Sequence, residues 1–102
     1  MLDKRKFYID GEWVDPINKN DFNVINPCNE DPCAVISLGS TEDTNKAVKA
    51  AKTAFETWKE TTKEERIKLL EKLLTIYKKR YSEMVDAISL EMGAPADWSK
   101  DV

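Results

Sequence analysis

The sequence has 102 residues, of which 41% are hydrophobic and 34% charged, a balance typical of one soluble globular domain rather than of a disordered chain. Its 16 basic and 19 acidic residues are interspersed and leave a net charge of −3, so no basic face predicts binding to nucleic acid. No apolar run approaches the ~20 residues of a membrane-spanning helix and no signal-peptide core follows the first residues, which predicts a cytoplasmic protein without a membrane partner.

The chain has two cysteines, Cys28 and Cys33, and no histidine. Neither a four-ligand zinc site nor a cysteine–histidine nucleophile can therefore be assembled from it. We expect both thiols to be structural. Cys28 in particular has no base or oxyanion donor that can be named beside it, so we assign it no catalytic role.

Residues 6 to 15 predict a β-hairpin. Short apolar runs flank Asp10-Gly11, a dipeptide favoured at the positive φ angles of a type I′ turn. Its aromatic side chains could form a stacking platform for bases or sugars, or they could pack on a core. We expect packing of Phe7, Tyr8 and Trp13, because no basic residues stand on the same strand face.

Two further β-rich runs, 22–25 and 34–38, are separated by the loop residues 26–32. Asparagine, aspartate and two prolines dominate this loop, which favours turn conformations. We expect the two runs to pair with each other. Residues 1–39 are therefore predicted to form β-hairpins.

Residues 40–60 predict a first helix. Ser40 or Thr41 can cap it, and Glu42 and Asp43 give its first turn the charge that the helix dipole favours. Its apolar residues recur at three- and four-residue steps, which predicts one buried face and one solvated face. That apolar stripe consists of Ala47, Val48, Ala51, Ala54, Phe55 and Trp58.

Residues 62–92 predict a long second helix. Thr62 and Glu65 match a capping box, and no glycine or proline interrupts the pattern from Lys63 to Met92. The helix carries a main apolar stripe and a second apolar flank, a width that needs more than one neighbour. The stripe consists of Ile67, Leu70, Leu74, Tyr77, Tyr81, Met84 or Val85, and Ile88, and the flank of Leu69, Leu73 and Ile76.

Such a helix is too long for a domain of this size. At about 1.5 Å per residue it would extend roughly 45 Å, whereas a compact domain of 102 residues should be only about 33 Å across. The overhang would expose apolar surface that a larger protein would cover. Residues 93–102 begin a further element after Gly93 and Pro95, so we expect the chain to be the N-terminal piece of a larger protein.

Three stretches of the sequence resemble the N-terminal region of NAD(P)-dependent aldehyde dehydrogenases. They are residues 7–14 (FYIDGEWV), 24–30 (VINPCNE) and 40–95. Each motif is weak alone, but the hairpin, the Asn-Pro strand end, two capped helices and Leu-Glu-Met-Gly occur in the family's order. Cys28-Asn29 stands where most members have Ala-Thr, and Cys33 where an aliphatic residue is usual. The resemblance implies an α/β, aldehyde-dehydrogenase-like (Rossmann-like) fold, of which this chain holds N-terminal β-hairpins followed by two α-helices, the second long.

The resemblance also implies a function for the larger protein. Members oxidise an aldehyde to a carboxylic acid with NAD or NADP through a cysteine thiohemiacetal, and they assemble as homodimers or homotetramers. The catalytic cysteine and glutamate, the oxyanion-hole asparagine and the glycine-rich cofactor turn belong to family segments beyond residue 102. We therefore assign no catalytic and no cofactor-binding residue to this chain and expect no turnover from it alone.

One site carries over by resemblance to some members, which bind a monovalent cation through backbone carbonyls near the Ile-Asn-Pro strand and a carboxylate near the end of the long helix. By position these are Val24, Ile25 and Glu91. Hard oxygen ligands suit sodium or potassium. The alternative for Glu91 is a solvated or salt-bridged residue at a helix end.

A second function remains open from the residues themselves. The chain could be a stand-alone protein-interaction module, in which a helical hairpin on a β layer offers its broad apolar face to a partner protein. No recognised partner motif accompanies that face. A reading frame that continues past Val102 into a glycine-rich turn and a catalytic cysteine would favour the enzyme.

Overall fold

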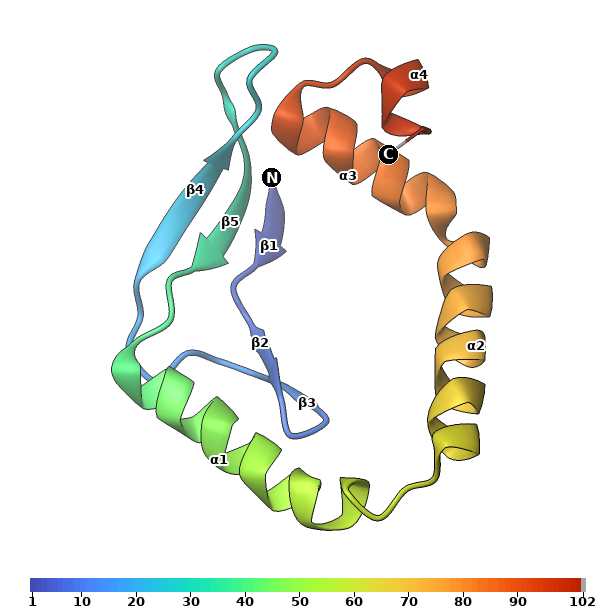
Figure 1. Cartoon of the computed structure of the whole chain (residues 1–102). Coiled ribbons are helices and arrows are strands. Elements are labelled where there is room, and N and C mark those ends of the chain that lie inside the picture. Colours follow the sequence, from blue (N-terminus) through green and yellow to red (C-terminus); the bar gives the residue numbers. More distant parts are fainter. Residues whose placement is uncertain (102) are drawn as a thin grey trace. The chain divides into compact units, whose positions relative to one another are not determined.

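The computed structural model describes residues 1–101 and divides into two compact units (Figure 1). One unit comprises Met1–Ile25 and Pro32–Glu60, and the other comprises Asn26–Asp31 and the chain from Thr61 on. All strands and the first helix belong to the first unit, and the later helices to the second. The chain is therefore α/β, with strands before helices, as expected.

A three-stranded sheet has the order β1-β5-β4, with β1 at Leu2–Lys4, β4 at Asp21–Ile25 and β5 at Pro32–Ser37. The antiparallel pairing of β4 with β5 was expected, and a register shift follows Val24. Strand β1, which pairs parallel with β5, was not expected. Its three residues carry two charges and no alternating apolar pattern, so no local signal marks it as a strand.

The expected hairpin is present, with β2 at Phe7–Ile9 and β3 at Glu12–Val14. Asp10 and Gly11 have φ angles of 54° and 79°, the left-handed values of a type I′ turn. Of the aromatic residues, Phe7 is half-buried, whereas Tyr8 and Trp13 are 63% and 67% exposed. Within the described residues these two side chains do not pack on a core; they pair with each other across the strands, with ring centroids 5.2 Å apart.

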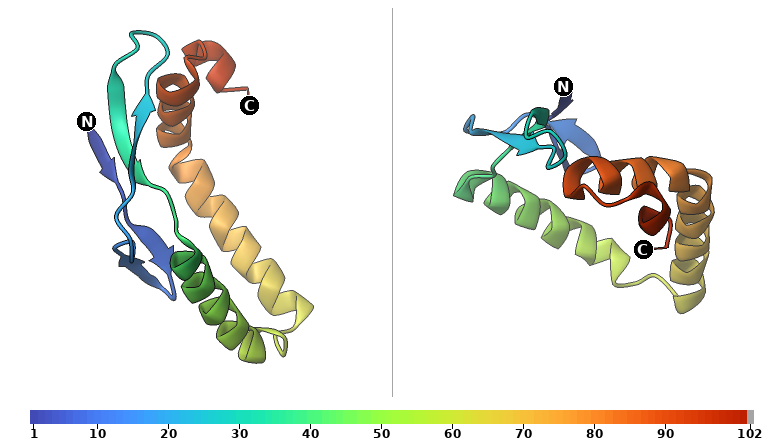
Figure 2. Two further views of the ribbon diagram at one scale, coloured as in Figure 1. Left: turned by 90° about the vertical axis from the view of Figure 1, so that its left-hand side faces the viewer. Right: turned by 90° about the horizontal axis from the view of Figure 1, so that it is seen from above.

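Helix α1 spans Thr41–Trp58 and begins at a capping box of Ser40 and Asp43. It lies beside the hairpin (Figure 2). Alanines of α1 and residues of the hairpin turn line one hollow. Small side chains on this face let the hairpin backbone approach. The shallow hollow between them is lined by Tyr8, Ile9, Asp10, Gly11, Ala47, Ala50, Ala51 and Ala54.

The long helix expected at 62–92 is wrong as a single element. The structure has α2 at Lys63–Lys79 and α3 at Tyr81–Met92, and the chain changes direction between them (Figure 1). Arg80 lies at the break with φ −104° and ψ 15°, outside the helical region. Its guanidinium bonds both carboxylate oxygens of Glu83 in the next turn, which stabilises the start of the new direction. The apolar period continues through the break, so periodicity alone does not reveal it.

Helix α3 ends at Gly93, whose φ of +69° forms a left-handed cap, and a short helix α4 at Ala96–Ser99 folds back on it. The hydroxyl groups of Ser89 and Ser99 lie 3.0 Å apart, and Ser99 is only 1% exposed. The Tyr81 hydroxyl donates to the carbonyl of Lys100. These contacts hold the last described residues against α3.

Among the described residues the hydrophobic core is small: only Ile9, Ala34 and Val85 are buried apolar side chains. Large apolar side chains on both units stay exposed instead. No helix within residues 1–101 combines the length and the hydropathy that a bilayer crossing requires.

Candidate functional site

The residues expected at a cation site lie at the ends of two elements. Val24 and Ile25 close strand β4 in the first unit, where the Val24 carbonyl accepts a 3.4 Å hydrogen bond from the Cys33 thiol. Glu91 lies in the last turn of α3, in the second unit, and is exposed. Its carboxylate forms no hydrogen bond or ion pair within residues 1–101.

The segment that follows Ile25 is a tight turn within the second unit. The Asn26 side-chain oxygen accepts from the Cys28 amide at 2.9 Å, and the Asn26 carbonyl accepts from the Glu30 amide at 2.8 Å. Glu30 itself has a φ of 62°. The turn is thus defined by its own hydrogen bonds and by an asparagine that can cap it.

This turn packs against the end of α3. A Cβ built on Gly93 would lie 2.8 Å from Cγ of Pro27 and 3.6 Å from the Cys28 sulfur. Only glycine, which has no Cβ, can lie this close to Pro27. The positive φ of Gly93 also favours glycine at this position. Pro27 and Gly93 therefore join two motifs that are far apart in the sequence.

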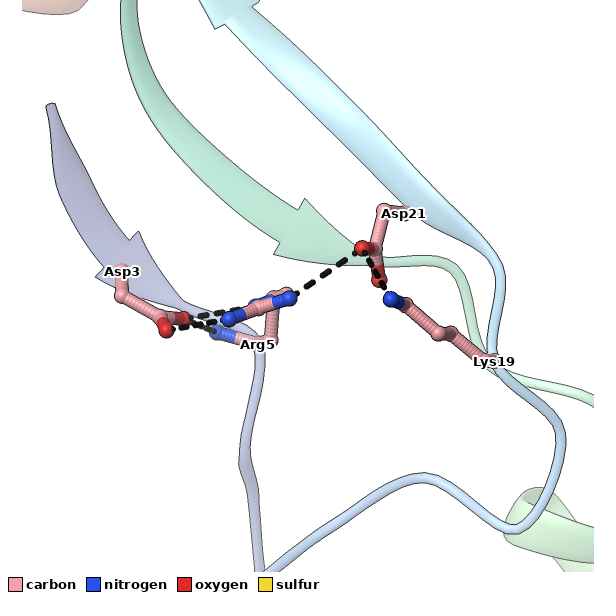
Figure 3. A network of polar contacts seen from close by, with 4 residues as sticks. All are labelled: Asp3, Arg5, Lys19 and Asp21. Atoms are coloured by element: carbon pink, nitrogen blue, oxygen red, sulfur yellow. Dashed lines mark hydrogen bonds and ion pairs between the residues drawn. The ribbon is translucent and has the colours of Figure 1, made fainter.

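A polar network connects the edges of the three-stranded sheet (Figure 3). The Arg5 guanidinium binds both carboxylate oxygens of Asp3, at 2.9 and 2.6 Å, and reaches Asp21 on β4 at 3.2 Å. Lys19 adds a 3.5 Å ion pair to Asp21. Hydrogen bonds from Arg5 lower the pKa of Asp3 from 3.8 to about 2, and the two carboxylates raise that of Arg5.

Ser37 of β5 is paired with Asp21 in the sheet register. Ser37 is 8% exposed, and its hydroxyl finds no hydrogen-bond partner in the part of the chain described. An open hollow of about 900 Å³ adjoins it. It is lined by Asp3, Lys4, Arg5, Lys6, Trp13, Asp15, Pro16, Lys19, Asp21 and Ser37. Because both signs of charge line this hollow and Arg5 is already paired, we assign it no charged ligand.

Asp43 is the most buried carboxylate described, with 4% exposure. It accepts from the amides of Ile17 at 2.8 Å and Ser40 at 2.9 Å, and from the Ser40 hydroxyl at 2.7 Å. These bonds, with that from Ile17 the strongest, lower its pKa. Asp43 therefore ties the loop before β4 to the start of α1, a structural role.

The described residues contain neither a metal-ligand cluster nor a glycine-rich turn. Residues 1–101 hold no group of three or more histidine, cysteine, aspartate or glutamate side chains that could bind a metal. Cys28 is exposed and Cys33 half-buried, and both are free thiols. Gly11, Gly39 and Gly93 stand alone, so none of them belongs to a glycine-rich phosphate turn.

Comparison with known proteins identifies what the whole chain resembles. The model of the aldehyde dehydrogenase family matches residues 13–101. A 3-succinoylsemialdehyde-pyridine dehydrogenase of a Pseudomonas species is 44% identical over 95 residues, which are 93% of this chain and 20% of that protein. The chain thus spans about a fifth of the length of the curated relatives it matches.

Solved structures give the same result for the fold. An aldehyde dehydrogenase from Bartonella henselae has a TM-score of 0.98 and 56% identity, over 100% of this chain and 21% of its own. Aldehyde dehydrogenase C from Pseudomonas syringae, solved as a mutant with NAD⁺ and octanal, has a TM-score of 0.93 and 37% identity, over 96% and 20%. A betaine aldehyde dehydrogenase mutant from Staphylococcus aureus, solved with NAD⁺, has a TM-score of 0.88 and 33% identity, over 98% and 20%.

Proposed function

This chain belongs to the aldehyde dehydrogenase family, and we propose that it forms the N-terminal part of an enzyme that oxidises an aldehyde to a carboxylic acid with NAD or NADP. One observation carries the proposal: the chain superimposes over its full length on a fifth of the Bartonella henselae aldehyde dehydrogenase, with 56% identity. In this enzyme the role of the chain is structural. Its strands and helices pack on the part of the fold that binds the cofactor.

The N-termini of α1 and α2 do not fit the phosphates of a nucleotide cofactor. The helix N-termini of α1 and α2 are occupied by their own capping boxes, through Asp43 and Glu65. A phosphate would have to displace a carboxylate at either end, and no glycine-rich turn precedes them. We therefore assign NAD or NADP, the catalytic thiol and the general base to the remainder of the enzyme.

The cation site of Val24, Ile25 and Glu91 is part of this proposal. The supporting observation is the donor set itself, two backbone carbonyls and the carboxylate of Glu91, for which residues 1–101 supply no hydrogen bond or ion pair. Hard oxygens suit a sodium or potassium ion. Crystals of the complete enzyme soaked in a heavier monovalent cation should give anomalous signal beside Val24 and Glu91, and its absence would reject the site.

An aldehyde substrate, a cytoplasmic location and assembly as a homodimer or homotetramer are further parts of the proposal. The octanal and betaine aldehyde named for two of the similar structures belong to those proteins. They favour an aldehyde as the class of substrate of this protein, but they do not indicate which aldehyde.

A chimera tests the proposed function. The 102-residue chain replaces the matching segment of the Bartonella henselae aldehyde dehydrogenase, and NADH or NADPH formation is followed with a panel of aldehydes. We expect the chimera to be active and the isolated chain to be inactive. A folded chimera without activity, beside an active parent, would reject the proposal.

A further inference from the structure

Strand β1 lies at one edge of the three-stranded sheet, where Leu2, Asp3 and Lys4 pair with β5. All three residues are exposed, and Leu2, the apolar one among them, is 52% exposed. Burial of apolar side chains therefore contributes little to holding β1 in the sheet. A short strand near a chain terminus that lacks buried side chains opens at a low cost in free energy.

The side chain that follows β1 joins this strand to the opposite edge of the sheet. Strand β5 lies between β1 and β4, so the two edge strands are not paired with each other. The Arg5 guanidinium nevertheless binds Asp3 in β1 at 2.6 Å and Asp21 in β4 at 3.2 Å (Figure 3). The Arg5 amide adds a 3.2 Å bond to the Asp3 carboxylate. Arg5 therefore connects β1 to β4 independently of the backbone pairing with β5.

The connection through Arg5 has a defined geometry but is open to solvent. Nε and Nη2 of Arg5 bind the two carboxylate oxygens of Asp3, which fixes the orientation of the guanidinium and leaves Nη1 for Asp21. The side chains of Arg5 and Asp21 are 38% and 29% exposed. Because salt screens the attraction between exposed charges, the bond from Arg5 to β4 should weaken as the ionic strength rises.

We propose that β1 is a detachable strap and that Arg5 is its latch, so that the strap leaves β5 when salt or a substitution breaks the bond between Arg5 and Asp21. All residues of the latch lie in the first unit, and the latch is therefore independent of the proposed function. Release of the strap uncovers one edge of β5, Pro32–Ser37. An uncovered strand edge is a template for pairing with another chain, so the latch also protects this edge.

Hydrogen exchange in the complete protein tests the latch. Mass spectrometry follows exchange in peptides that cover β1, and the hairpin of β2 and β3 serves as the internal reference because its strands pair with each other. We expect Arg5→Gln to accelerate exchange in β1 by about three- to tenfold, the size expected for the loss of two exposed ion pairs. Exchange in the hairpin should not change.

Two variants at the β4 end of the latch separate Arg5 from its neighbours. Asp21→Ala removes the acceptor on β4, whereas Lys19→Ala removes only the 3.5 Å ion pair between Lys19 and Asp21. We expect Asp21→Ala to accelerate exchange in β1 by at least about twofold and Lys19→Ala to leave it unchanged, because Arg5 still binds Asp21. Both variants keep the trypsin sites at Lys4, Arg5 and Lys6. The rate of cleavage at these sites is the second readout and should show the same difference.

Salt separates the latch from a merely structural contact. Between about 0.1 and 1 M sodium chloride the Debye length falls from about 10 to about 3 Å. Exchange in β1 of the parent should accelerate towards the rate of Arg5→Gln, and exchange in that variant should not respond to salt. A parent that is insensitive to salt, or equal rates in Asp21→Ala and Lys19→Ala, would overturn the proposal. Faster exchange in the hairpin as well would also overturn it, because the whole N-terminal region and not one strand would then open.

Discussion

The ring of Pro27 lies so close to Gly93 that a Cβ on that glycine would stand 2.8 Å from the proline Cγ. Gly93 is also left-handed, with a φ of +69°. Two independent demands for glycine therefore coincide at the end of α3. Their coincidence explains physically why the Asn-Pro strand end and the Leu-Glu-Met-Gly helix end occur together.

We expect Gly93→Ala to lower the opening free energy of the turn at 26–31 by about 2–3 kcal/mol, because left-handed strain and a steric clash combine. The readout is hydrogen exchange of the Glu30 amide, which donates to the Asn26 carbonyl. Gly11→Ala is the matched control. Gly11 has a φ of +79°, but a Cβ built on it would meet nothing within 4 Å. Gly11→Ala should therefore lower the opening free energy of the hairpin by only about 1 kcal/mol.

Pro27→Ala should relieve part of the Gly93→Ala defect, because the clashing Cγ atom is removed. In the double variant, the loss of opening free energy of the turn should differ by about 1 kcal/mol from the sum of the losses in the two single variants. Additive costs would contradict a direct contact between these residues.

Arg5 should govern the titration of Asp3. In the parent chain, carbon NMR of the Asp3 carboxyl should give a pKa of about 2, and Arg5→Gln should return that pKa towards 3.8. A lowered folded pKa means that the pair stabilises the fold above pH 3.8 and that this contribution disappears as the pH falls towards 2. Arg80→Gln removes a comparable pair with Glu83 and should leave Asp3 unchanged. An unchanged Asp3 midpoint in Arg5→Gln would refute the assignment.

Asp43 should control the loop before β4. Asp43→Ala leaves the amides of Ile17 and Ser40 without acceptors, so exchange of the Ile17 amide should accelerate roughly five- to tenfold, a range typical of lost helix caps. Glu65→Ala removes the equivalent capping box of α2 and should leave Ile17 protected. Similar exchange of Ile17 in both variants would show that Asp43 does not hold this loop.

Local signals predicted much of the fold. Asp10-Gly11 identified the hairpin turn, and Ser40 or Thr41, together with Thr62, identified the starts of two helices, because turns and caps depend on residues close in sequence. The pairing of β4 with β5 followed from a short connection. These elements needed no knowledge of distant contacts.

Other features depend on partners far away in the sequence. Strand β1 exists through its pairing with β5, and Arg5 reaches Asp21 only because that sheet forms. The break at Arg80 is accompanied by a bond from Tyr81 to Lys100, which no periodicity encodes. At the candidate site the sequence offered Val24, Ile25 and Glu91 by resemblance alone, and the contact of Pro27 with Gly93 had no local signal beyond the glycine itself.

The isolated chain should bind a hydrophobic dye through the exposed face of α2. Leu70→Gln with Leu73→Gln should reduce dye fluorescence, whereas Glu71→Gln with Lys72→Gln should not, because only the first pair reduces the apolar surface. Equal fluorescence of all three proteins would place the exposed apolar surface elsewhere.

The most direct measurement of the central claim is the rate of aldehyde-dependent NADH formation by the chimera in which this chain replaces the N-terminal segment of the Bartonella henselae relative. With 56% identity and a TM-score of 0.98 between the exchanged parts, we expect a rate within about tenfold of the parent enzyme. A folded, NAD-binding chimera that forms no more NADH than the isolated chain would contradict the claim.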